Sequence, residues 1–318
     1  MARRFAVLML VATIGSATGA HAQGSLTNGR PDYRPIVLHV ACGEVFNAPC
    51  AKVLPRIAAR TARAGLELQP VESGLALDTA AAVCQGQVAA AFVPRDAIAQ
   101  VGNQPACQGR YDIVGRPLYP YYAFLVVRAD APYRRVDDLA REGRQRAIAA
   151  GPPGSGGRVT LGLLRQANPA LQRATSVAND DAETALAGVS NGSLDAFFSM
   201  ETLGGALIDR IRGRRDAAGK PLFAFIDVDP GQDFWREGDG GGHCLYRLAA
   251  LDFGGPSPIT TVSVDAVMVL GRAFRDAHAR GGPSAPDALA SAIDSAHAAI
   301  LTDMKSPPDW RPAGALCQ

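Results

Sequence analysis

The stretch GPPGSGGRVT, residues 151–160, contains the residue types best suited to bind a ligand or to do chemistry. A nucleotide-binding P-loop requires a lysine after its second glycine, and here Gly157 follows Gly156 instead. A G-x-S-x-G nucleophile turn would use Ser155, but Pro153 stands where the first glycine of that motif belongs. The loop therefore fails the nucleotide-binding motif and matches the serine-hydrolase motif only in part.

Two interpretations of this loop remain open at the level of sequence. In the first, the N–H groups of Gly154, Gly156 and Gly157 approach an anion or carboxylate at a helix start, where backbone donors are unsatisfied. The Ser155 hydroxyl and the Arg158 guanidinium would then complete the site. In the second, the loop is a tight turn in which Ser155 caps the helix and Arg158 faces solvent.

The chain contains six cysteines, an even number that suits disulfide bonds in an oxidising compartment. Many pairings are open to six cysteines, and proximity favours Cys42–Cys50 and Cys84–Cys107, leaving Cys244 for Cys317. The sequence contains no C-x-x-C or H-E-x-x-H motif. We therefore expect no metal site and no cofactor.

The first 22 residues have the pattern of a secretory signal peptide. Arg3 and Arg4 precede the apolar stretch Phe5–Thr13, and Ala20 and Ala22 form a small-x-small cleavage site. We expect cleavage near Ala22 and a periplasmic mature chain, because no apolar stretch reaches the about 20 residues of a membrane span. Loss of the two arginines takes the formal net charge from +2 to 0, which argues against a nucleic-acid partner.

The mature chain contains two halves that share one order of expected elements: strand, loop, helix, strand, helix, strand. The first half has expected strands at Ile36–Ala41, Leu66–Val71 and Val88–Val93, and expected helices at Pro49–Arg63 and Asp78–Gln85, the latter capped by Asp78. The second has expected strands at Arg146–Ala150, Thr175–Val177 and Leu194–Ser199, and expected helices at Arg158–Ala167 and from Asp180 or Asp181 to Ser190. This alternation predicts an α/β fold with parallel-rich sheets covered by helices.

The remaining segments predict how the two halves connect. Residues 122–127 and 259–270 have the pattern of strands, and residues 136–141, 273–279 and 286–304 that of helices. We expect residues 23–120 to form a first lobe and residues 121–258 a second lobe that includes the crossover. Residues 259–318 would return to the first lobe. Two lobes built in this way leave a cleft between them, where small ligands usually bind.

Three short motifs together resemble a known family. GPPGSGGRVT is similar to G-x-x-G-S-G-T, Leu118-Tyr119-Pro120 to an LYP segment, and VSNGSLDAFF at residues 189–198 to L..GklDAff. These motifs are found in the TAXI family, the extracytoplasmic solute receptors of TRAP-type transporters, and their order agrees over about residues 36–300. The resemblance implies a type II periplasmic-binding-protein fold, in which two lobes close on a small solute, commonly an organic acid or amino acid.

The resemblance also implies a cleft lined by residues that follow the strands. These residues are Gly43, Glu44, Asn47, Glu72, Ser73, Tyr119, Gly154, Ser155, Gly156, Gly157, Arg158 and Ser199. The sequence departs from the family pattern in two places. CGEVFNAPC, residues 42–50, replaces a glycine-rich segment, and Gly157 replaces a threonine. A carboxylate of Glu44 or Glu72 in the cleft would suit an amino or amide group on the solute.

The sequence therefore predicts an exported receptor, without catalytic activity, that captures a small carboxylate-bearing solute for a TRAP-type transporter. Its partners would be the solute and the membrane subunits of the transporter, and we expect a monomer. One alternative is a ligand sensor or protein-binding module of the same fold. Another is a secreted hydrolase that uses Ser155 as its nucleophile.

Overall fold

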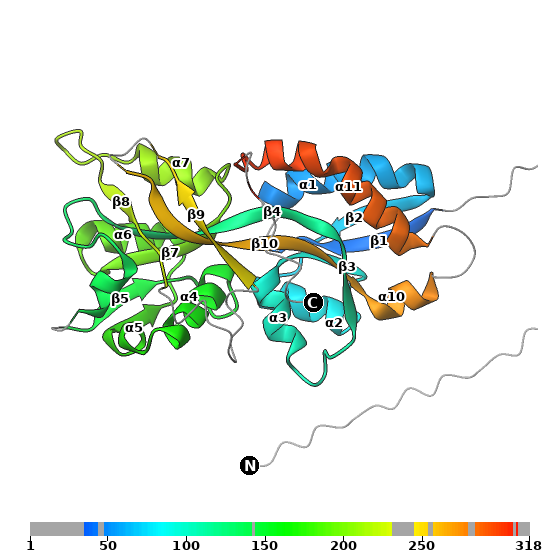
Figure 1. Ribbon diagram of the computed structural model, residues 1–318, viewed down its shortest axis with the longest axis horizontal. Helices are drawn as coiled ribbons and strands as arrows, with labels where there is room; N and C mark the ends of the chain where they lie inside the picture. Colours follow the sequence, from blue (N-terminus) through cyan, green and yellow to red (C-terminus); the bar gives the residue numbers. More distant parts are fainter. Residues whose placement is uncertain are drawn as a thin grey trace, which may run out of the picture. The chain divides into compact units, whose positions relative to one another are not determined.

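The computed structural model contains the two repeats expected from the sequence (Figure 1). It describes residues 35–43, 48–141, 144–230, 245–253, 257–278, 284–307 and 310. The first repeat consists of β1 (Ile36–Ala41), α1 (Ala48–Thr61), β2 (Leu66–Val71), α2 (Ala76–Cys84) and β3 (Ala90–Pro94). The second consists of β5 (Arg146–Ala149), α4 (Gly156–Ala167), β6 (Thr175–Ala178), α6 (Ala182–Asn191) and β7 (Ala196–Glu201).

Shorter elements and two long strands complete the described chain. The helical ones are η1 (Ala62–Ala64), α3 (Arg95–Gly102), η2 (Val136–Ala140), α5 (Pro169–Ala174), α7 (Ala206–Gly213), α10 (Arg272–Ala277) and α11 (Ala285–Asp303). The remaining strands are β4 (Tyr111–Arg128), β8 (Phe223–Ile226), β9 (Tyr246–Leu251) and β10 (Ile259–Gly271).

The two repeats have the same strand topology. In the first, β1 lies in the middle and pairs in parallel with β2 and β3. In the second, β5 lies in the middle and pairs in parallel with β6 and β7. Because parallel neighbours require helical crossovers, both faces of each sheet are covered. The carboxyl ends of β1 and β3, and likewise those of β5 and β7, therefore lie at one edge of each sheet.

Strands β4 and β10 connect the two halves. The strand order is β2-β1-β3-β10-β4-β7-β5-β6, and β10 and β4 pair antiparallel with each other. β10 also pairs with β3, and β4 with β7, so each long strand belongs to both halves. Figure 1 shows both strands running from one half into the other. A lobe boundary at residue 120 therefore falls inside β4.

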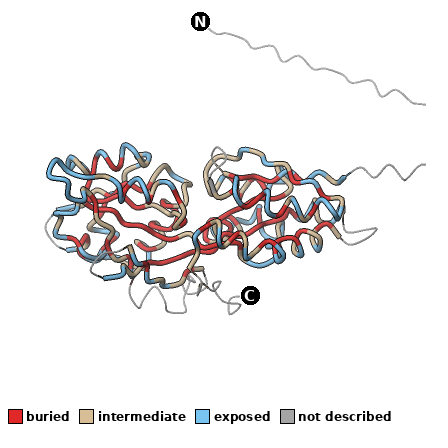
Figure 2. The backbone as a smooth tube through the Cα atoms, turned by 90° about the horizontal axis from the view of Figure 1, so that it is seen from above, coloured by how far each residue is buried: buried red, intermediate tan, exposed pale blue. Residues whose placement is uncertain are grey.

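Helices cover both faces of the sheet in each half. In the first half, Ile57 of α1 and Ile293 of α11 pack on one face, and Ile98 of α3 packs on the other. In the second half, Leu161 of α4 packs on one face and Leu186 of α6 on the other. Figure 2 shows the buried backbone concentrated along the strands between these helices. This is the two-lobed α/β architecture that the sequence predicts.

The helix starts are confirmed at two positions and corrected at a third. Ser155 caps α4, and Asp181 caps α6 by accepting a hydrogen bond from the Thr184 N–H at 2.8 Å. The assignment of Asp78 as the cap of α2 is wrong, because the helix begins at Ala76. Asp78 lies in the first turn instead, and its carboxylate reaches back to accept from the Leu75 N–H at 3.3 Å.

Two of the three expected disulfides are confirmed. Cys42 is bonded to Cys50 and Cys84 to Cys107, with Cα–Cα distances of 5.6 and 5.3 Å. Cys244 and Cys317 lie outside the described residues, as does the expected signal segment. In the described part of the chain, no helix combines the length and the apolar character that a membrane span requires.

Candidate functional site

A cavity of about 450 Å³ lies where the carboxyl ends of the strands of both repeats meet. The first half contributes the end of β1 at Cys42 and Gly43, together with the start of α2. The second half contributes the turn between β5 and α4, the start of α6, and residues 197–201 of β7. In α/β sheets, ligands bind outside the carboxyl ends of the strands. The repeat thus accounts for the position of this cavity.

Phe92 and Phe198 occupy equivalent positions in the two repeats and form apolar parts of the cavity wall. Each follows a left-handed glycine, Gly86 or Gly192, that ends the preceding helix. The two segments, GQVAAAF and GSLDAFF, therefore place a phenylalanine at the same point of each repeat. An apolar wall of this kind suits the carbon skeleton of a small molecule.

The glycine loop forms the N-terminus of α4 at the cavity. The Ser155 hydroxyl accepts from the Arg158 N–H at 3.4 Å and donates to the Ala150 carbonyl at 3.0 Å. The structure thus confirms Ser155 as a helix cap. Ser155, Gly156 and Gly157 all line the cavity. N–H groups in the first turn of a helix have no partner within the helix, so the two glycines bring backbone donors to this wall.

Gly157 is required by close packing of α4 on the sheet. A Cβ at this position would lie 3.1 Å from the carbonyl oxygens of both Ala150 and Phe198. Both oxygens belong to backbone, one directly after β5 and the other within β7, which cannot easily move. At Gly156 the nearest atom to a Cβ would be 3.9 Å away, on Met200. The absence of a threonine at position 157 therefore follows from the approach of α4 to the strands.

The glycine loop also contacts the first lobe directly. The Leu77 N–H donates to the Gly154 carbonyl at 3.0 Å, which joins the first turn of α2 to the loop before α4. A Cβ at Gly154 would lie 3.6 to 3.7 Å from the side chains of Leu75 and Leu77. The two lobes thus touch beside the cavity, so that the cavity is bordered by both.

The carboxyl groups of the described cavity lining have no basic side chain beside them in that lining. Asp180, Asp181 and Glu201 line the cavity, and no lysine, arginine or histidine is among its described lining residues. Burial raises the pKa of the Glu201 carboxyl to about 7. Hydrogen bonds from the backbone N–H and side chain of Thr184 lower the pKa of Asp181. The described lining therefore offers carboxylates and no basic side chain to a ligand.

Glu201 was missed at the level of sequence. Strand β7 was expected to end at Ser199, but it continues to Glu201 and pairs with Tyr122 of β4. Its carboxyl lies against the start of α7, because a Cβ at Gly205 would be 2.6 Å from Glu201 Oε2. The sequence signal that could have identified Glu201 is its position as a polar residue at the end of a buried strand.

Five of the residues expected in the cleft line the cavity: Gly43, Ser155, Gly156, Gly157 and Ser199. Five others are outside its lining: Glu72, Ser73, Tyr119, Gly154 and Arg158. Glu44 and Asn47 lie outside the described residues.

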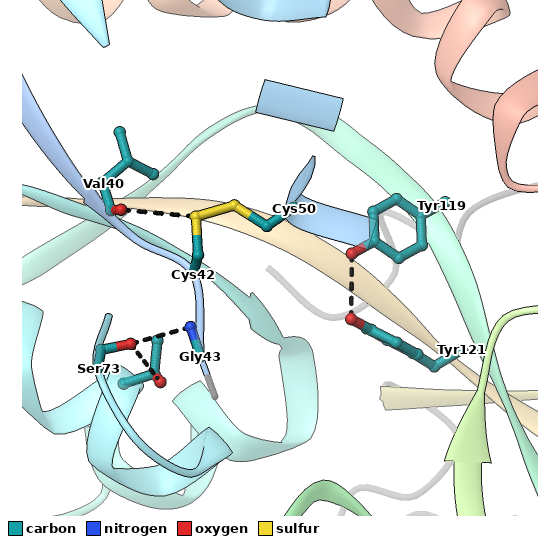
Figure 3. Close-up of a disulfide and its surroundings, with 8 residues drawn as sticks. Val40, Cys42, Gly43, Cys50, Ser73, Tyr119 and Tyr121 are labelled. Atoms are coloured by element: carbon teal, nitrogen blue, oxygen red, sulfur yellow. Dashed lines mark hydrogen bonds between the residues drawn. A yellow bond between two sulfur atoms is a disulfide. The ribbon is translucent and has the colours of Figure 1, made fainter. Parts of the chain in front are cut away.

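Ser73 and Tyr119 each make a hydrogen bond to a residue of the cavity lining (Figure 3). The Ser73 hydroxyl accepts from the Gly43 N–H at 3.0 Å, which fixes the end of β1 beside the Cys42–Cys50 disulfide. Tyr119 is buried, and its hydroxyl is 3.1 Å from that of Tyr121, which lines the cavity. Ser73 and Tyr119 therefore position the lining residues Gly43 and Tyr121 and do not line the cavity themselves.

Glu72 and Arg158 are placed differently from expectation. Glu72 is exposed. Arg158 lies near Arg165 on α4, since its charge contributes to lowering the Arg165 pKa. The Nη1 atom of Arg158 is buried without a hydrogen-bond partner among the described residues. Arg158 is not among the described residues that line the cavity.

Comparisons with known proteins identify the fold. No protein-family model matches the sequence, and no curated protein matches it. A probable amino-acid ABC transporter extracellular-binding protein from Bacillus subtilis has a TM-score of 0.54 and 9% identity over 87% of this chain and 100% of its own. The GluR0 ligand-binding core in complex with L-glutamate has a TM-score of 0.50 and 11% identity, covering 85% and 97%. The fold is that of the two-lobed type II periplasmic binding proteins.

Proposed function

We propose that the protein is an exported receptor that binds a small polar solute between its lobes and delivers it to a TRAP-type transporter. The observation that carries this proposal is the cavity of about 450 Å³ lined by strand ends and helix starts of both repeats. A cavity of this size suits a small molecule. The resemblance at residues 118–120, 151–160 and 189–198 supports the choice of transporter class.

We assign recognition of the solute to residues that line the cavity. The N–H groups of Gly156 and Gly157 donate to an oxygen of the solute, because the helix itself leaves them without partners. Phe92 contacts its carbon skeleton, and Tyr121 adds a hydroxyl beside it. Arg158 has no part in this assignment, since it is outside the described lining.

Solute binding acts on the contact between the lobes. The Leu77–Gly154 hydrogen bond joins α2 to the glycine loop beside the cavity. A solute that touches both lobes binds the closed arrangement better than an open one and shifts the population toward it. A transporter can then distinguish the loaded receptor from the empty one by shape.

The structure favours binding over hydrolysis at Ser155. Its hydroxyl donates to the Ala150 carbonyl at 3.0 Å and accepts from the Arg158 N–H at 3.4 Å. A serine nucleophile needs a base within hydrogen-bond reach. No histidine is among the described residues that line the cavity. Ser155 is therefore assigned to helix capping.

Thermal-shift screening of the mature chain, residues 23–318, against cationic, zwitterionic and anionic small molecules tests the proposal. We expect at least one compound at millimolar concentration to raise the melting temperature, because ligands of the folded state stabilise it. Replacing the lining residue Ser199 in Ser199→Trp should fill the cavity and abolish the shift. Ser176→Trp, at an exposed position of β6, is the matched control. No stabilisation by any compound would contradict the proposal.

A further inference from the structure

We propose that the solute is a cation that carries a protonated amine, which binds against the carboxylate of Glu201. This inference rests on the proposed function, because it assigns a chemical class to the solute of the same cavity. It differs from the expectation of a carboxylate-bearing solute held by Arg158. Three observations support it: the state of Glu201, the charges of the lining, and the helix ends around it.

Glu201 is a partly buried carboxyl in the cavity lining that lacks a counter-charge. Among the described residues it has neither a hydrogen-bond nor an ion-pair partner, and burial alone accounts for its raised pKa. An unpaired acid at such a site is costly when ionised, and a cation removes that cost. By contrast, Asp195 and Asp138 are paired with Arg144 and Arg141.

The other charges of the described lining have the same sign. Asp180 and Asp181 lie at the start of α6 and line the same cavity as Glu201. The described lining contains no basic side chain that could neutralise them. A carboxylate-bearing solute would meet the carboxylates of Asp180 and Asp181, and also that of Glu201 above about pH 7. An ammonium group would be attracted by all three, since a charge-assisted hydrogen bond to a carboxylate is stronger than a neutral one.

Carboxylates offset the positive ends of two of the helices that start at the cavity. Asp78 accepts from the Leu75 N–H at the start of α2, and Asp181 accepts from the Thr184 N–H at the start of α6. Each carboxylate offsets the partial positive charge of its helix end. The first turn of α4 contains no acidic side chain and keeps its partial positive charge. Its N–H groups can hold a hydroxyl or carbonyl oxygen of a cationic solute.

A four-carbon series separates charge from size in a thermal-shift assay. The probes are butane-1,4-diamine, 4-aminobutan-1-ol, 4-aminobutyrate and succinate, each at the same millimolar concentration and constant ionic strength. We expect the diamine and the amino alcohol to raise the melting temperature by several degrees, 4-aminobutyrate to do so less, and succinate to have no effect.

Variants locate the amine within the cavity. Glu201→Gln keeps the shape of the side chain and should reduce the affinity for the amines at least tenfold in titration calorimetry. Asp181→Asn retains a capping residue and should weaken binding several-fold. Glu67→Gln, at an exposed position of β2, removes a charge elsewhere and should leave binding unchanged. The melting temperature of each variant without probe shows that it folds.

The outcomes distinguish this inference from the proposed function. A larger shift with succinate or 4-aminobutyrate than with the diamine overturns the cationic solute and leaves the receptor function standing. Unchanged amine affinity in Glu201→Gln overturns the assigned position. Absence of any shift, here and in the broader screen, contradicts both. Amine binding that is strongest with the diamine and lost in Glu201→Gln supports the inference.

Discussion

Glu201 is the residue whose ionisation most directly links the cavity to the stability of the empty protein. Its pKa is raised from 4.5 to about 7 by burial, so the folded chain holds this proton more tightly than the unfolded chain does. The stability contributed by the protonated form is fully present below about pH 4.5 and is lost as pH rises through about 7. The difference corresponds to at most about 3 kcal/mol.

Glu201→Gln should remove this pH dependence. The glutamine side chain cannot ionise, so the variant should gain stability relative to the parent protein as the pH increases from about 5 to about 8. Denaturant unfolding at several pH values measures the free energies of unfolding for both proteins. Parallel pH profiles would show that Glu201 has an ordinary pKa in the folded state.

At the level of single residues, the sequence predicted local roles better than ligand contacts. Ser155 and Asp181 are caps because hydroxyl and carboxylate oxygens match the free N–H groups of a first helical turn, a relation visible in the sequence. Glu201 could not be identified, because a carboxyl without a partner is defined by what surrounds it in space. For the same reason the position of Arg158 outside the described lining had no sequence signal.

At the level of elements, the contact of α4 with the sheet depends on Gly157. An alanine Cβ would lie 3.1 Å from two carbonyl oxygens, so Gly157→Ala should destabilise the protein by about 1–3 kcal/mol. Gly156→Ala is the matched control, because its Cβ would have 3.9 Å of space. At Gly156 the helical preference of alanine should make the change neutral or stabilising by about 0.5–1 kcal/mol.

Unfolding of both variants in urea measures the difference in their free energies of unfolding. Gly157→Ala should also bind solute more weakly, because the N–H donors at the start of α4 would shift. Equal free energies of unfolding for Gly157→Ala and Gly156→Ala would mean that α4 can move away from the strands without cost. In that case, packing would not account for glycine at position 157.

Strands β1 and β2 have their expected bounds, whereas β4 is much longer than expected. The strand β1 is a mainly apolar run and β2 begins with alternating apolar and polar residues, and both are followed by turn residues. In β4, the expected strand began at Tyr122, yet the structure extends it back to Tyr111. Pro117 and Pro120 lack N–H groups, and Gly115 has a positive φ of 68°. In the sequence, prolines and a glycine of this kind indicate a loop. In the structure they are part of β4, which pairs with β10 through an irregular register at Ala266–Met268.

At the scale of the whole described unit, the sequence predicted two lobes but not the contacts that join them. The alternation of elements determines which strands pair within each repeat, and both repeats follow it. Contacts between the lobes connect residues that are distant in the chain, such as Asp96 and Tyr246, and no local pattern indicates them. The buried polar cluster around Asp96 and Tyr246 is an example of such a contact between the lobes.

Asp96 joins the two lobes through hydrogen bonds made in the interior. It lies on α3 of the first lobe and is 1% exposed. Its Oδ2 accepts from the Thr160 hydroxyl of α4 at 2.7 Å and from the Tyr246 hydroxyl of β9 at 2.6 Å. Burial raises the pKa of Asp96, and these hydrogen bonds oppose that effect. Separation of α3 from α4 and β9 would leave Oδ2 of this carboxyl without the Thr160 and Tyr246 hydroxyls, while Oδ1 would keep the Ala97 N–H.

Tyr246→Phe should therefore destabilise the closed arrangement of the lobes as well as the fold. Removing one donor from a buried carboxylate costs about 1–3 kcal/mol. Tyr133→Phe is the matched control, because the Tyr133 hydroxyl donates to Asp195 at 3.0 Å within the second lobe alone. Both variants should lose stability in urea, but only Tyr246→Phe should increase the radius of gyration of the empty protein in small-angle X-ray scattering and weaken solute binding. If both variants scatter like the parent protein, the Asp96 cluster stabilises the fold without controlling the separation of the lobes.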